Sequence, residues 1–298
     1  MTSPSPYKLF DVTLLRKEAL SPCLWRFTFG GPQVAAMKTC AADQRIKVFL
    51  PDAAGRPPAL PDAPDWYATY KAQDPATRPP MRTYTIRQLR PEDAEVDIDF
   101  VLHGETGPAS TWATHAQPGE RLQITAPNGA YAGDPGGYEW KPPAGLKRLL
   151  LIADETALPA VAGILEQLAA LPEPPQTQAF IEVPHNGDQI ALASWPGLAV
   201  EWMARDENAP GALMVLAAER ATLPLSAPAR GAPVLADVDV DSVILWDQAA
   251  PQDSGFYGWV AGEAAAVLAI RRLLIQERGI DRKALNLMGY WREGRVLD

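Results

Sequence analysis

The chain has few of the residues that bind metals through sulfur or imidazole. Its 298 residues include two cysteines, Cys23 and Cys40, and three histidines. Two cysteines cannot form the disulfide framework of a small secreted protein, nor supply the four thiolates of an iron–sulfur cluster. Three dispersed histidines argue against a zinc or haem site built by the protein alone. We therefore expect no protein-bound metal.

Long apolar runs are also missing. No stretch of about eighteen apolar residues occurs, and the first residues lack the basic and then apolar segments of a signal peptide. We expect a cytoplasmic protein that has no membrane partner and acts as a monomer. The formal net charge of −9 argues against general binding to nucleic acid. It leaves room for a local basic pocket that binds a small anion.

Residues 1–145 have the pattern of an antiparallel β-barrel. Short runs alternate between apolar and polar residues and are broken by glycine and proline, as in strands with one buried face. The pattern predicts strands at residues 8–14, 24–29, 45–50, 82–87, 96–101 and 121–124. The proline-rich residues 51–80 are predicted to be an exposed insertion, and residues 133–143 a connection to a second domain.

Residues 146–298 change to alternating strands and helices. Residues 147–153 are a continuous apolar run, typical of a strand buried on both faces of a parallel sheet. Helices are predicted near 157–170 and 263–278, and further strands at 178–183, 199–203, 258–262 and 284–288. The predicted fold class is therefore an antiparallel six-stranded β-barrel followed by a parallel-sheet α/β domain.

The predicted strand at residues 82–87 carries chemistry suited to a flavin dinucleotide. Side chains alternate along a strand, so Arg82 and Tyr84 share one face, and Thr83 and Thr85 share the other. A guanidinium can bind a pyrophosphate through two hydrogen bonds, and an aromatic ring can lie beside the isoalloxazine. Further along, residues 107–113 place small residues before a predicted helix, where N–H groups can face phosphate. Together these segments predict a bound flavin.

The second domain lacks the usual dinucleotide signature. No G-x-G-x-x-G motif occurs, and the turn after the first predicted strand is Asp154-Glu155-Thr156. Two carboxylates at this turn repel phosphate unless they are offset, although acidic side chains suit the start of a helix. A dinucleotide-binding fold therefore cannot be argued from this turn alone.

Six segments together resemble a known family. They are RTYTIR at 82–87, DFVLHG at 99–104, GPASTWA at 107–113, ADETALPA at 153–160, AGE at 261–263 and GYWR at 289–292. In this order they resemble the siderophore-interacting proteins, which are flavin-dependent ferric-siderophore reductases related to ferredoxin reductases. The resemblance covers roughly residues 7–294. Residues 221–254 depart from it, because this segment is longer than the family pattern predicts.

The resemblance implies a function for each domain. Residues 1–145 would be the FAD-binding barrel, with non-covalent FAD, and residues 146–298 would bind NADPH or NADH. The electrons would pass to the iron of a ferric siderophore. No catalytic side chain is implied, because hydride and electron transfer need no strong general base and the chelator already holds the iron.

The resemblance also implies roles for individual residues. Arg82 would bind the FAD pyrophosphate, Tyr84 would pack on the isoalloxazine ring, and Thr85 would bond near the flavin N5. Further cofactor contacts are implied at Val101, His103, Ala109, Ser110, Thr156, Ala157, Gly262 and Glu263. Many ferric siderophores are anionic, and the resemblance implies that Lys47 contacts the substrate. Arg292 and Arg295 of the C-terminal segment are further candidates.

Each of these residues has an ordinary structural interpretation as well. Arg82 and the three substrate cations can be surface charges, Tyr84 a core aromatic, and Ser110 a helix cap. Two other functions also remain open. One is a flavin reductase or diaphorase that passes electrons to a protein carrier. The other is a siderophore-binding or flavin-storage protein without nicotinamide turnover.

Overall fold

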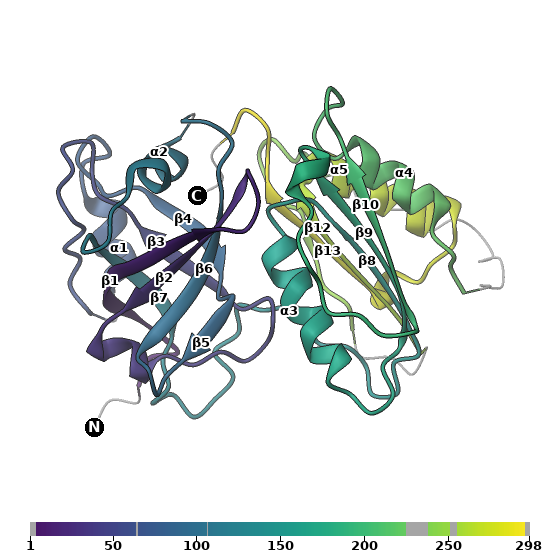
Figure 1. The fold of residues 1–298 in the computed structure, drawn as a ribbon, viewed down its shortest axis with the longest axis horizontal. Helices are drawn as coiled ribbons and strands as arrows, with labels where there is room; N and C mark the ends of the chain where they lie inside the picture. The colour runs from purple at the N-terminus through teal and green to yellow at the C-terminus, as the bar shows by residue number, and fades with distance from the viewer. Residues whose placement is uncertain (1–3, 64, 106, 225–237, 251–254, 296–298) are drawn as a thin grey trace. The chain divides into compact units, whose positions relative to one another are not determined.

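The chain folds into two compact units, each built around one sheet (Figure 1). A computed structural model describes residues 4–63, 65–105, 107–224, 238–250 and 255–295. The first unit extends to Tyr138 and the second begins at Glu139. Within the described ranges, no helix is both long and apolar enough to cross a membrane.

The sheet of the first unit is antiparallel and, in the part of the chain that is described, has seven strands. Their order is β4-β3-β7-β1-β2-β6-β5. The strands are β1 (Tyr7–Ala19), β2 (Leu24–Gly30), β3 (Arg45–Phe49), β4 (Met81–Thr85), β5 (Gln88–Arg90), β6 (Glu95–Val101) and β7 (Arg121–Pro127). The six predicted strands are present, and the prediction missed β5, which is too short to show an alternating pattern.

One continuous stretch of chain connects the two edges of this sheet. Strand β4 pairs with β3 at one edge, and β5, which follows it directly, pairs with β6 at the other. Between them, the Ile86 N–H donates to the Gln44 carbonyl and the Arg87 N–H to the Asp97 carbonyl, both at 2.9 Å. The sheet therefore curls until its edges share the RTYTIR segment, as a barrel requires.

The inside of the curled sheet is rich in aromatic residues. The rings of Phe27 and Phe100 lie 4.6 Å apart, and Phe100 lies 5.8 Å from Trp112 of helix α2 (Pro108–His115).

Residues 51–80 were predicted to be exposed, and this is wrong in part. They contain helix α1 (Trp66–Ala72), whose buried Tyr70 packs 5.4 Å from Phe49, because the apolar side chains of the insertion cover the outer face of the sheet.

The second unit is a doubly wound sheet. Among its described residues the strand order is β10-β9-β8-β12-β13-β11. The strands are β8 (Arg148–Ala153), β9 (Gln176–Val183), β10 (Leu198–Ala204), β11 (Trp246–Asp247), β12 (Phe256–Glu263) and β13 (Leu285–Trp291). All pairs are parallel except β11 with β13. The predicted fold class is thus confirmed, with an antiparallel edge strand added.

Helices cover both faces of this second sheet (Figure 1). Helix α3 (Leu158–Ala169) lies on one face, and α4 (Ala212–Arg220) and α5 (Ala264–Arg272) lie on the other. Alternate residues of β8 face opposite ways, and Leu150 and Ile152 join the core beneath α4 and α5. Within segment 221–254, which is longer than the family pattern predicts, residues 225–237 and 251–254 lie outside the described residues, and β11 lies in the remainder.

Candidate functional site

Strand β4 presents Arg82, Tyr84 and Thr85 in the first unit. The guanidinium of Arg82 is half-buried, and its Nη1 donates to the Met81 carbonyl at 2.8 Å. The ring of Tyr84 lies 4.2 Å from Phe100 of β6, and burial raises the pKa of the Tyr84 hydroxyl, which therefore remains a hydrogen-bond donor. Thr85 is buried at the end of the strand. A cation, a ring and a hydroxyl are thus close together.

The start of helix α2 lies near the same aromatic cluster. Its N-cap is Gly107, which offers no side chain, and Pro108 has no N–H group. The N–H groups of Ala109 and Ser110 in the first turn therefore have no side-chain cap, and such groups suit an anion. Ser110 is buried inside the helix, so its interpretation as the helix cap is wrong.

Two further predicted contacts lie between β6 and α2. Val101 is half-buried at the end of β6, and His103 is exposed in the connection that follows. The contacts from Tyr84 through Phe100 to Trp112 tie β4, β6 and α2 together. The structure thus brings Tyr84, Val101 and helix α2 together around one end of β6.

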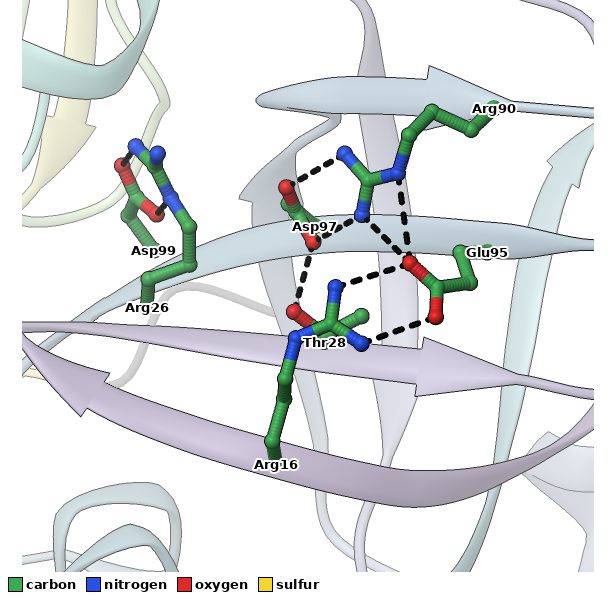
Figure 2. Close-up of polar contacts among 7 residues, drawn as sticks. All are labelled: Arg16, Arg26, Thr28, Arg90, Glu95, Asp97 and Asp99. Carbon is green, nitrogen blue, oxygen red and sulfur yellow. Dashed lines mark hydrogen bonds and ion pairs between the residues drawn. The ribbon is translucent and has the colours of Figure 1, made fainter. Parts of the chain in front are cut away.

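Arginines and carboxylates hold β6 on its outer face (Figure 2). Arg26 binds Asp99 through two hydrogen bonds of 2.8 and 2.9 Å, and Arg90 bonds Asp97 with both Nη atoms at 2.7 Å. Glu95 accepts two 2.8 Å bonds from Arg16. Because Asp97 and Asp99 are buried, these bonds are needed to offset their desolvation.

In the second unit, functional candidates lie where the parallel strands end, which we call the carboxyl edge. Asp154 follows β8 and is 1% exposed. Its Oδ2 accepts the Glu263 N–H at 2.8 Å and the Trp291 Nε1–H at 2.7 Å. Its Oδ1 accepts the Thr156 N–H at 2.9 Å and the Thr156 hydroxyl at 2.5 Å. One carboxylate therefore joins the ends of β8, β12 and β13.

Three other predicted cofactor contacts, Gly262, Glu263 and Ala157, also lie at the carboxyl edge. Gly262 has no room for a side chain, since a Cβ there would lie 2.6 Å from Asp154 Oδ2. Glu263 caps α5, because its Oε2 accepts the Ala266 N–H at 2.9 Å. Ala157 is buried just before α3. The carboxyl edge is closely packed by the chain's own groups.

The sequence did not predict a buried group of ion pairs that lies beside Asp154. Arg205 binds Glu155 through two hydrogen bonds of 2.6 and 2.7 Å, and it lies 3.6 Å from Glu182. Glu182 in turn accepts the N–H groups of Gly211 and Leu213 at 2.7 and 2.9 Å, at the start of α4. The only sequence signal was a charged residue, Glu182, that follows the apolar run 179–181 of strand β9.

The predicted substrate cations are placed in different surroundings. Lys47 lies opposite Thr83 on the neighbouring strand and donates to its hydroxyl at 2.7 Å. Arg292 binds Asp241 at 2.7 Å and Glu263 at 2.8 Å. Arg295 is exposed near the end of the described chain. Arg292 thus already binds two carboxylates. To bind a substrate as well, it would have to share its guanidinium with these carboxylates or release one of them.

The donor sets of the two units suit different ligands. Arg82, Tyr84 and the open start of α2 supply the cation, the aromatic surface and the N–H donors that a flavin dinucleotide needs. At the carboxyl edge, N–H groups are already bonded to carboxylates, so this edge fits a pyrophosphate poorly. Among the described residues, no group of three or more His, Cys, Asp or Glu side chains could hold a metal ion.

Comparisons with known proteins match both units. Residues 13–131 match the family model of the siderophore-interacting FAD-binding domain, and residues 146–294 match that of the siderophore-interacting protein. A crystal structure of a siderophore utilization protein from T. fusca is similar, with a TM-score of 0.73 and 28% identity. The similarity covers 98% of this chain and 96% of that one.

Two relatives have names that state an activity. Ferric vibriobactin reductase ViuB of Vibrio cholerae is 29% identical over 287 residues, which cover 94% of this chain and 88% of that protein. An NADPH-dependent ferric-chelate reductase of Escherichia coli is 34% identical over 203 residues, which cover 67% of this chain and 72% of that protein.

Proposed function

Because the chain belongs to the siderophore-interacting protein family, we propose that it reduces the iron of ferric siderophores with electrons from NADPH or NADH, through FAD. The observation that carries the proposal is that Tyr84 of β4, the strand of Arg82 and Thr85, and Trp112 of α2 both pack on Phe100, inside the segment that matches an FAD-binding domain. The names of the two relatives support the ferric acceptor.

The residues of the first unit would bind and orient the cofactor. Arg82 would bind the pyrophosphate, and the N–H groups of Ala109 and Ser110 would add donors to phosphate. Tyr84, held by Phe100, would present its ring to the isoalloxazine, with Thr85 near the flavin N5 and Val101 and His103 alongside. FAD would supply the ability to accept a hydride as an electron pair and to release electrons singly.

The substrate would be held by charge rather than by coordination. Many siderophores that carry iron are anionic, and Lys47 would contribute a positive charge next to Thr83, with Arg292 and Arg295 as further candidates in the second unit. No protein ligand to iron is required, because the chelator holds the metal. Ferrous iron binds hard oxygen donors less tightly than ferric iron, so reduction promotes release.

The purified protein offers a direct test of this proposal. We expect the absorbance spectrum of a flavin, which NADPH or NADH bleaches under anaerobic conditions and which a ferric chelate then restores. Faster reoxidation by a protein electron carrier than by any ferric chelate would favour the diaphorase. Failure of both nicotinamides to bleach the flavin would contradict the proposal and favour a binding or storage protein.

Replacing Arg82 tests the cofactor site. Charge-assisted hydrogen bonds contribute about 1.5–3 kcal/mol each, so Arg82→Ala should weaken FAD binding by about tenfold to a hundredfold. The measurement is the flavin content after gel filtration, with Arg121→Ala on β7 as the matched control. Full retention of FAD by Arg82→Ala would contradict its role at the pyrophosphate.

A further inference from the structure

The order of strands in the second unit marks the place where a nucleotide would be expected. From β8 the chain proceeds through β9 to β10 on one side, and later through β12 to β13 on the other. The direction of winding therefore reverses between β8 and β12. In doubly wound sheets, ligands bind outside the carboxyl ends of the strands at this reversal, with phosphate at a helix start.

A buried carboxylate of the chain occupies this position. Asp154 follows β8, and its Oδ2 accepts the N–H of Glu263 at the end of β12. Its Oδ1 accepts the N–H of Thr156, just before α3. Both N–H groups are of the kind that would otherwise face a phosphate. Gly262 allows the close approach, because any Cβ would lie 2.6 Å from Oδ2.

Two helix starts in this unit are closed by carboxylates of the chain. Glu182 accepts N–H groups of Gly211, Leu213 and Met214 at the start of α4. Glu263 accepts the N–H of Ala266 at the start of α5. Both carboxylates are buried. Carboxylates of the chain thus cap α4 and α5, whereas at α3 the carboxylate of Asp154 binds the turn before the helix, at Thr156.

The charges at this edge disfavour a second anion. Asp154, Glu155, Glu182 and Glu263 are all buried. Arg205 binds Glu155 and lies 3.6 Å from Glu182, and Arg292 binds Glu263. Burial, followed by the charge of Glu155, raises the pKa of Asp154, even though Thr156 and Trp291 donate to it. Because the charge of Glu155 already disfavours ionisation of Asp154, a further anion at this edge is disfavoured as well.

We propose that Asp154 is a specificity-determining residue that excludes the dinucleotide pyrophosphate from the carboxyl edge of the second unit. The electron donor is then recognised through its nicotinamide half, and the pyrophosphate and adenosine contribute little. This inference rests on the proposed function for the identity of the donor, but the exclusion of pyrophosphate can be tested independently.

The first test measures binding of ADP-ribose, which carries the pyrophosphate and adenosine but no nicotinamide. Calorimetric titration of the full-length, FAD-loaded protein at pH 8 should show no binding at concentrations up to millimolar. Binding with a micromolar dissociation constant would overturn the inference. This outcome does not depend on any enzymatic turnover, so it separates failure of the inference from failure of the proposed function.

The second test compares electron donors by stopped-flow bleaching of the flavin. NADPH, NADH and reduced nicotinamide mononucleotide should give second-order rate constants within about tenfold of each other, because a bound pyrophosphate alone would contribute far more. A preference of a hundredfold or more for either dinucleotide would overturn the inference. Bleaching by none of the three would count against the proposed function, and the titration with ADP-ribose would still decide the inference.

A third test removes the charge of Asp154 and compares the rate constants of the three electron donors. Asp154→Asn should raise the rate constants for NADPH and NADH by about tenfold relative to that of the mononucleotide, because one repulsive charge is removed. Glu201→Gln, which removes one exposed charge on β10, is the matched control and should change none of them. Equal changes for all three donors in Asp154→Asn would overturn the inference.

Discussion

At the scale of single residues, Asp154 and Gly262 form a close contact at the carboxyl edge. Asp154 has four hydrogen-bond donors around it, and Gly262 leaves space for its Oδ2. The sequence indicated that both residues lie at a strand-to-helix turn. It could not show that they touch, because they are far apart along the chain and no local pattern encodes the contact.

Gly262→Ala should destabilise the protein. The new Cβ would lie 2.6 Å from Asp154 Oδ2 and 3.0 Å from Met214 Cε. Overpacking of this kind costs about 1–3 kcal/mol of the free energy of unfolding, which urea denaturation would measure. In an Asp154→Ala background the same change should cost less, because the nearest atoms are gone. Equal costs in both backgrounds would contradict the contact.

The pKa of Asp154 predicts a dependence of stability on pH. Burial and the charge of Glu155 raise this pKa to about 7, above its value in the unfolded chain. The folded state then binds the proton more strongly, so stability is lost as pH rises from about 4 to about 7. Relative to the wild type, Asp154→Asn should gain stability over this range in urea denaturation. A constant difference between the two proteins would refute the assignment.

At the scale of elements, β6 connects the charged outer face of the first sheet to the candidate FAD site. Glu95, Asp97 and Asp99 alternate with the buried Val96, Ile98 and Phe100. The first three bind arginines, and Phe100 packs against Tyr84. The strand is thus held on both faces before it reaches Val101.

Glu95→Gln removes one set of the ion pairs that hold β6 and should lower the free energy of unfolding. Hydrogen bonds, first from Arg16 and then from Arg90, lower the pKa of Glu95 to about 2. Its contribution to stability is therefore present above about pH 4.5 and is lost as the pH falls toward about 2. At pH 7 the variant should be less stable than the wild type by about 1 kcal/mol or less, because the Arg16 side chain is exposed.

The difference between Glu95→Gln and the wild type should shrink between pH 4.5 and pH 2. The measurement is the urea midpoint at several pH values, with Glu92→Gln in the exposed turn before β6 as the control. A difference that stays constant over this range would contradict the role of the ion pairs.

The elements that could be predicted are those with a long pattern. Alternation located β1, β2, β3, β4, β6 and β7, and apolar runs located β8 and β12. The short strands β5 and β11 carry no readable period, and α1 lies in a proline-rich stretch. The capping of α4 by Glu182 joins residues about thirty positions apart, so the sequence alone could not locate it.

At the scale of the whole molecule, six short segments carried most of what the sequence could predict. They indicated the siderophore-interacting family, which the matches to residues 13–131 and 146–294 confirm. The individual roles of Arg82, Lys47 and the other site residues stay predictions, because contacts with a ligand depend on atoms that the chain does not supply. At the turn where a glycine-rich loop is missing, Asp154 accepts the N–H of Thr156.

The net charge of −9 also belongs to this scale. An acidic molecule that binds an anionic chelate must do so through local cations, and attraction of this kind weakens as salt screens it. If Lys47 contacts the substrate, Lys47→Gln should raise the apparent KM for an anionic ferric chelate and flatten its dependence on ionic strength. An unchanged salt dependence would remove Lys47 from the substrate site.

The most direct test of the central claim counts electrons. The FAD-loaded protein is incubated anaerobically with a limiting amount of NADPH and an excess of a ferric siderophore, and ferrous ion is captured with a chromogenic chelator. We expect about two ferrous ions for each nicotinamide oxidised, because a hydride carries two electrons. Oxidation of NADPH without ferrous ion, or ferrous ion only after a protein electron carrier is added, would contradict the account.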